Sequence, residues 1–193
     1  MDLKRERFSK DDVLKAAMLN MVKFYTTVHK KSSHLVGPVN LRELLIDPEN
    51  GHFEVKIDGD REALMHDIDS VKFMPPEVLN NGPRWSLAAD RFVLAELLFT
   101  LRYCKHPYDG RKVLEQPVTD VETARQRYGS CRFIFDPDDQ TNGLDYYADP
   151  NPVDSWKGDS KSELKEAFIQ VFTHGYLDAS LRLSDKAWEY LIG

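Results

Sequence analysis

The sequence predicts a mainly α-helical domain with one small β hairpin, which is an α+β fold. Three patterns support this prediction: a long amphipathic helix near the N-terminus, two short apolar runs joined by a turn, and an apolar helix near the middle of the chain. The 193 residues, of which 41% are hydrophobic, are enough for one domain over residues 1–193 with its own core.

The first helix is expected to follow Ser9, a residue type that caps helix N-termini, with two acids directly behind it. Apolar residues then recur at helical spacing over residues 13–28. The helix should end near Lys30 and Lys31, because cations are stabilised at a helix C-terminus.

The hairpin is expected from the apolar runs at residues 44–46 and 53–57. The linker between them, residues 47–51, ends in Asn-Gly, which is typical of a hairpin turn, and the second run alternates as a strand does. Residues 58–74 show no clear period, so we expect them to be irregular.

The apolar helix spans residues 86–103 and is apolar on nearly every face, which predicts burial on all sides. Before it, residues 75–79 should form a short helix or turn that is broken at residues 80–83 by the Asn-Asn-Gly-Pro sequence.

The second half of the chain should contain a helical segment at residues 118–128 and two closing helices at residues 161–175 and 184–191. Ser184 is a plausible N-cap for the last helix. Residues 140–158 are rich in Asp, Pro and Asn, and we expect them to form a surface loop.

Composition argues against several classes of partner and location. The net charge is -6 and the basic residues near the start are interleaved with acids, so we expect no nucleic-acid partner. No apolar run approaches the roughly 20 residues that span a bilayer, and the N-terminus lacks an apolar signal segment. Cys104 and Cys131 lack metal-site spacing. We therefore expect a cytoplasmic protein with reduced thiols and no membrane partner.

Five segments follow one another in an order that resembles the large, C-terminal lobe of protein kinases. Residues 36–46 are similar to the catalytic loop with its following strand, and residues 56–60 to the strand before the magnesium-binding Asp. Residues 74–77 are similar to the Ala-Pro-Glu motif, and residues 85–110 to the central buried helix with its following turn. Residues 182–188 are similar to the turn before the last helix. The His-Pro-Tyr-Asp-Gly turn at 106–110, the 133–139 run and Trp188 further resemble a bacterial kinase-like, pseudokinase group associated with phosphatase-type partners.

The resemblance implies that the catalytic motifs are degenerate. Pro38 stands at the catalytic Asp position, so the base that accepts the hydroxyl proton is missing. Asp58 matches the metal-binding Asp and Glu43 replaces the metal-binding Asn, which makes these two carboxylates weak candidates for a metal site, with turn capping as the alternative. No glycine-rich phosphate loop or small lobe is visible. Neither ATP nor magnesium is expected as a cofactor.

Three residues match positions that hold the kinase lobe together. Asp90 matches the acid of the buried helix that anchors the catalytic-loop backbone, and Glu77 with Arg182 matches the ion pair behind the Ala-Pro-Glu motif. The alternative is that all three are ordinary surface charges. His29 and His34 lack a partner at fitting spacing and are expected to be surface or capping residues, and Cys104 with His106 is expected to belong to a helix end.

These features lead to the hypothesis of a catalytically inactive pseudokinase-like binding or regulatory module that consists of a large lobe only. A protein partner is expected at the surface that would face a small lobe, around residues 36–40 and 58–61, with cover by the N-terminal segment as the alternative. One alternative is a phosphotransferase subunit of a split kinase, with the small lobe on another chain. The other is an unrelated helical protein-interaction domain.

Overall fold

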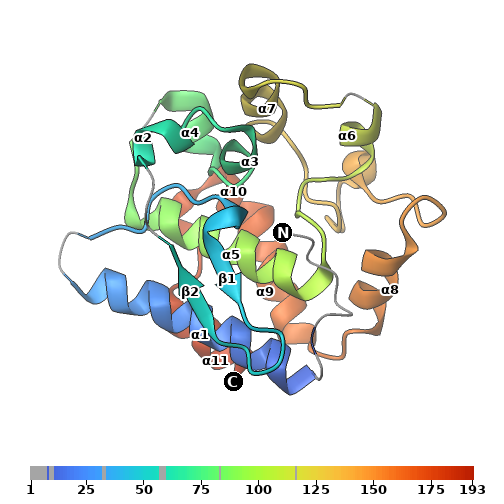
Figure 1. Cartoon of the computed structure of the whole chain (residues 1–193). Helices are drawn as coiled ribbons and strands as arrows, with labels where there is room; N and C mark the ends of the chain where they lie inside the picture. The colour runs from blue at the N-terminus through green and yellow to red at the C-terminus, as the bar shows by residue number, and fades with distance from the viewer. Residues whose placement is uncertain (1–7, 9–10, 32–33, 57–59, 83, 116) are drawn as a thin grey trace.

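The helix α5 (Leu87–Tyr103) lies at the centre of the molecule (Figure 1). The structure is a computed structural model, and it describes residues 8, 11–31, 34–56, 60–82, 84–115 and 117–193. Almost every residue of α5 from Ala89 onward is buried, as the sequence predicts. Ser86 caps the helix, because its hydroxyl oxygen accepts a hydrogen bond from the backbone N–H of Ala89 at 3.1 Å. The elements around α5 bury one continuous apolar core against it.

The helix α1 (Asp11–Lys30) confirms the predicted N-terminal helix; its expected cap, Ser9, lies outside the described residues. Its apolar stripe, which includes Leu14, Met18 and Tyr25, is buried. It packs against α5 and against the last helix, α11 (Asp185–Ile192), which Ser184 caps as predicted. Elements from the two ends of the described chain therefore lie side by side (Figure 1).

The hairpin is also confirmed. Strands β1 (Leu44–Ile46) and β2 (Phe53–Val55) are antiparallel, with Leu44 opposite Val55. Gly51 in the turn has a φ of 72° and lies so close to α1 that a Cβ atom would be 2.7 Å from the Val13 carbonyl oxygen. Glycine is therefore required for the turn to rest on the helix. A short 3₁₀ turn, η2 (Leu41–Glu43), precedes β1.

The irregular structure expected at residues 58–74 is wrong in part, because two one-turn helices form there. They are α2 (Arg61–Leu64) and α3 (Ile68–Val71), and each is started by the side chain of an aspartate, Asp60 or Asp67. Next comes α4 (Pro76–Asn81), which confirms the predicted short helix but continues through Asn80 and Asn81, where the sequence was expected to break it. Both α3 and α4 pack on α7 (Val121–Tyr128), which lies within the predicted 118–128 segment.

The surface loop expected at residues 140–158 is wrong in part, because only residues 143–149 are irregular. That segment holds a 3₁₀ turn, η3 (Gln140–Asn142), and the helix α8 (Pro150–Gly158), which packs against α5. A short helix that the sequence analysis did not predict, α6 (Arg111–Glu115), also follows the turn after α5.

The closing elements are α9 (Ser162–Phe172), α10 (His174–Leu177) and η4 (Ala179–Leu181), which lead to α11. The predicted 161–175 helix thus consists of α9 and the start of α10. Within the described ranges, no helix is both long and apolar enough to cross a membrane. The molecule is mainly helical with a small two-stranded sheet.

Candidate functional site

Asp90 lies in the first turn of α5 and is fully buried. Its carboxylate accepts hydrogen bonds from the backbone N–H groups of Val36 at 2.7 Å and Gly37 at 3.0 Å. The indole N–H of Trp85 donates to the same carboxylate at 2.6 Å. Asp90 therefore fixes the backbone of the segment that the sequence analysis compared with a catalytic loop.

His29, at the end of α1, bridges two carboxylates. Its Nε2 lies 3.0 Å from Asp90 Oδ2 and its Nδ1 lies 2.7 Å from Asp185 Oδ2. Its side chain is only 8% exposed, so the expectation of a surface or capping residue is wrong for His29. His34, by contrast, is exposed and its Nδ1 contacts the carbonyl oxygen of Lys31 at 3.0 Å. Sequence spacing could not reveal His29, because its partners are on two distant helices.

The two carboxylates keep His29 charged at neutral pH. Burial alone would lower the pKa of His29, but the hydrogen bonds to Asp185 and Asp90 overcome that effect and raise the pKa to about 9. The protonated imidazole then acts as an ionic bridge that joins α1, α5 and α11.

We expect the stability of the fold to decrease as the pH rises from about 6.5 to about 9. The folded pKa of about 9 exceeds the unfolded value of about 6.5, so this contribution is complete below the lower value and is lost as the pH passes the higher one. The loss should be about 2–3 kcal/mol, measured by urea unfolding at several pH values. A His29→Gln variant should lack this loss, and the matched His34→Gln variant should retain it. An unchanged pH profile in His29→Gln would contradict the assignment.

Two of the candidate positions, Pro38 and Glu43, lie beside the Asp90-anchored segment. Pro38 is buried, and its carbonyl oxygen accepts a hydrogen bond from Arg61 Nη1 at 2.7 Å. The same nitrogen pairs with Glu43 Oε2 at 3.1 Å, and Glu43 also completes a capping box with Asn40. Glu43 is thus engaged by a cation and a helix cap. Asp58 lies outside the described residues.

No group of three or more His, Cys, Asp or Glu side chains in the described part of the chain is arranged to hold a metal ion. The stretch that was expected to face a partner offers little accessible area: Val36, Pro38, Val39 and Asn40 are buried and Gly37 is half-buried. Arg61 reaches across this stretch through its bond to the Pro38 carbonyl.

Glu77 in α4 and Arg182 after η4 form a bidentate ion pair, in which both oxygen–nitrogen distances are 2.7 Å. The Arg182 side chain is 1% exposed, whereas that of Glu77 is 32% exposed. The guanidinium also donates to the carbonyl oxygens of Gly175 and Ala88 and lies over the ring of Phe92. Arg182 therefore links α4, α5 and α10 through one buried cation.

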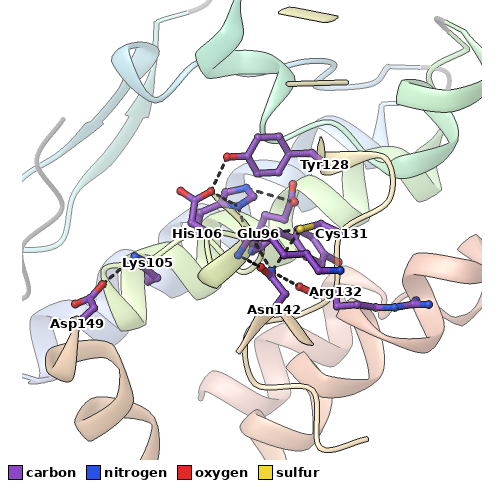
Figure 2. Close-up of polar contacts among 11 residues, drawn as sticks. Glu96, Lys105, His106, Tyr128, Cys131, Arg132, Asn142 and Asp149 are labelled. Carbon is purple, nitrogen blue, oxygen red and sulfur yellow. Dashed lines mark hydrogen bonds and ion pairs between the residues drawn. The ribbon is translucent and has the colours of Figure 1, made fainter. Parts of the chain in front are cut away.

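A second polar cluster surrounds His106, in the turn after α5 (Figure 2). His106 Nε2 lies 3.6 Å from Oε1 of the buried Glu96, which is beyond hydrogen-bond range. The hydroxyl of Tyr128 donates to Asp109 at 2.5 Å, and Asp109 lies 4.0 Å from His106 Nδ1. Burial raises the pKa of Glu96 well above its usual value and lowers that of His106 to about 4, so His106 is neutral near pH 7. Cys104 is the C-cap of α5, in keeping with the helix-end expectation.

Asn142, a residue that the sequence analysis missed, ties this turn to the segment that follows α7. Its side-chain amide is fully buried and donates to the carbonyl oxygens of Tyr108 at 3.0 Å and Arg132 at 2.7 Å (Figure 2). Its Oδ1 accepts from the backbone N–H of Lys112. An Asn in a polar, Pro-rich stretch carries no sequence signal that separates this role from that of a loop residue.

Comparisons with known proteins add no family assignment: no protein-family model matches the chain, and no curated protein matches it at a significant level.

Proposed function

We propose that this chain is a pseudokinase-like binding or regulatory module, similar to the large lobe of a protein kinase and without phosphotransferase activity of its own. The observation that carries the proposal is Pro38. It stands in a segment whose backbone is fixed to the central helix by Asp90, yet it offers no carboxylate where a kinase needs its catalytic base.

The contacts of Glu77 and Arg182 support the same proposal. A short helix that starts with Pro-Glu is tied by a bidentate ion pair to an arginine just before the last helix. The kinase resemblance expects this long-range pair, whose members are 105 positions apart, and an ordinary surface-charge interpretation does not.

The engagement of Glu43 supports the absence of ATP–magnesium chemistry. A metal ion at Glu43 would have to compete with the guanidinium of Arg61, which already neutralises the carboxylate at 3.1 Å. We propose that protein binding replaces phosphotransfer, with a cytoplasmic protein partner that docks outside the buried stretch of residues 36–40.

We expect ATP with magnesium to leave the thermal unfolding midpoint unchanged and the purified chain to transfer no phosphate. A ligand that binds the folded state must stabilise it, by about 2.7 kcal/mol at 100 times its Kd, so a thermal-shift titration is a sensitive test. Magnesium alone is the matched control. A midpoint shift or phosphate transfer that disappears in Asp58→Ala would overturn the proposal in favour of the split kinase.

A further inference from the structure

A pocket with a volume of about 350 Å³ lies between η2, the C-terminal end of α3 and the turn after α5. Its volume is in the range of small-ligand sites. Basic, polar and aromatic side chains line it, among them Arg42, Lys72, Phe73, Thr100, Lys105 and His106.

The acceptor side chains of this pocket are already used within the protein. Asp69 pairs with Arg42 at 2.9 Å, and Asp109 accepts the hydrogen bond from Tyr128. Asn40 accepts through its Oδ1 from the backbone N–H of Arg42. A ligand that enters the pocket therefore meets acceptors that have partners.

The groups that remain uncommitted are donors. In the described part of the chain, the ammonium group of Lys72 has no hydrogen bond or ion pair. Thr100 and His106 are both more than nine-tenths buried, and Thr100 Oγ1 and His106 Nε2 have no hydrogen-bond partner among the described residues. Because the backbone N–H of Tyr108 donates to His106 Nδ1 at 3.3 Å, the neutral ring carries its hydrogen on Nε2.

The side chains that line the pocket carry a net positive formal charge, because Arg42, Lys72 and Lys105 outnumber Asp69 and Asp109. Burial lowers the pKa of His106; among the nearby charges Asp109 has the largest effect and raises it, whereas Lys72 and Lys105 lower it. Lys105 Nζ forms an ion pair with Asp149 Oδ2 at 2.8 Å, and Asp149 is not one of the residues that line the pocket (Figure 2). Lys72 is the cation that a ligand can use without breaking an existing ion pair.

We propose that this pocket binds a phosphate monoester. A phosphate monoester carries three acceptor oxygens and about two negative charges, which match the donors of Lys72, Thr100 and His106 and the net positive formal charge of the lining. The ester would come either from a free small molecule or from a phosphorylated side chain of a partner protein. The inference uses only the side chains of the pocket, so it does not depend on the kinase-like interpretation.

The test is an NMR titration of the ¹⁵N-labelled full chain with O-phosphoserine, and with serine as the control ligand. We expect saturable shifts at the backbone amides of Lys72, Phe73 and Lys105. Lys72→Gln should weaken binding at least about tenfold, because it removes a charge-assisted contact, while Lys72→Arg should retain binding. Lys186→Gln, which removes an exposed cation on α11, is the matched control and should bind as the wild type does.

A second titration distinguishes the two sources. A phosphoserine peptide that binds more tightly than O-phosphoserine supports a partner protein, and equal binding supports a free small molecule. The proposal is overturned if O-phosphoserine produces no saturable shift in the millimolar range, or if Lys72→Gln binds as tightly as the wild type.

Discussion

Replacing Asp90 with alanine should lower the free energy of unfolding by at least about 4 kcal/mol. The buried carboxylate is the shared acceptor for the backbone N–H groups of Val36 and Gly37 and for the indole of Trp85. Each buried donor that loses its partner costs about 1–3 kcal/mol, and the protonated His29 would lose one of its two counter-charges. Asp90 thus serves as the common anchor of three segments.

Urea unfolding monitored by circular dichroism measures this effect. Asp90→Asn serves where the alanine variant does not fold: it keeps an oxygen acceptor but removes the charge, so it should be less destabilised than Asp90→Ala and still less stable than the wild type. Asp154→Ala removes an exposed acid of α8 and should change stability by no more than about 0.5 kcal/mol. If Asp90→Asn unfolded at the same urea concentration as the wild type, the role of Asp90 as the common anchor would be contradicted.

Replacing Glu77 with glutamine should destabilise the protein by about 3 kcal/mol. The change is nearly isosteric, but it leaves the guanidinium of Arg182 buried without a counter-charge. The Arg182 side chain is only 1% exposed, so an unpaired Arg182 is more costly than an unpaired Glu77, whose side chain is 32% exposed and is partly reached by water.

The matched control is the exposed pair of Arg42 and Asp69, whose side chains are 74% and 45% exposed. Asp69→Asn breaks the same type of interaction in water and should cost less than about 1 kcal/mol, measured by the same denaturant titration. Equal effects of Glu77→Gln and Asp69→Asn would show that the buried pair contributes no more than a surface pair.

The elements that the sequence predicts best are those whose stability is encoded by local periodicity. The α1 and α5 helices extend over many turns, so their apolar patterns identify them without any tertiary information. The hairpin at residues 44–55 was predictable because its turn and strand alternation lie within one short window.

The failures have tertiary causes. The helix α8 was predicted as loop because its sequence is rich in Asp, Pro and Asn. Trp156 stabilises α8 through its ring, which stacks on Phe135 with ring centroids 4.6 Å apart. The same ring packs against Tyr103 of α5 with ring centroids 5.1 Å apart. Neither contact is visible within a window of neighbouring residues, and tertiary packing outweighs the low helix propensity of the segment.

The site was predictable to the extent that a family resemblance supplies long-range partners. Glu77 with Arg182 and the position of Asp90 came from that resemblance, whereas His29 and Asn142 did not. His29 acquires its role from carboxylates that are 61 and 156 positions away in sequence. Such a residue can be identified only when the fold brings the three side chains together.

The bridge at His29 has a consequence for how the chain is made. Its partner Asp185 is 156 positions further along the chain, so α1 cannot complete its packing until the last helix has been translated. At about 5–20 residues per second, the ribosome needs roughly 8–30 s to cover this distance. During that interval the apolar stripe of α1 lacks α11, and the nascent chain should be a good substrate for chaperones that bind exposed apolar segments.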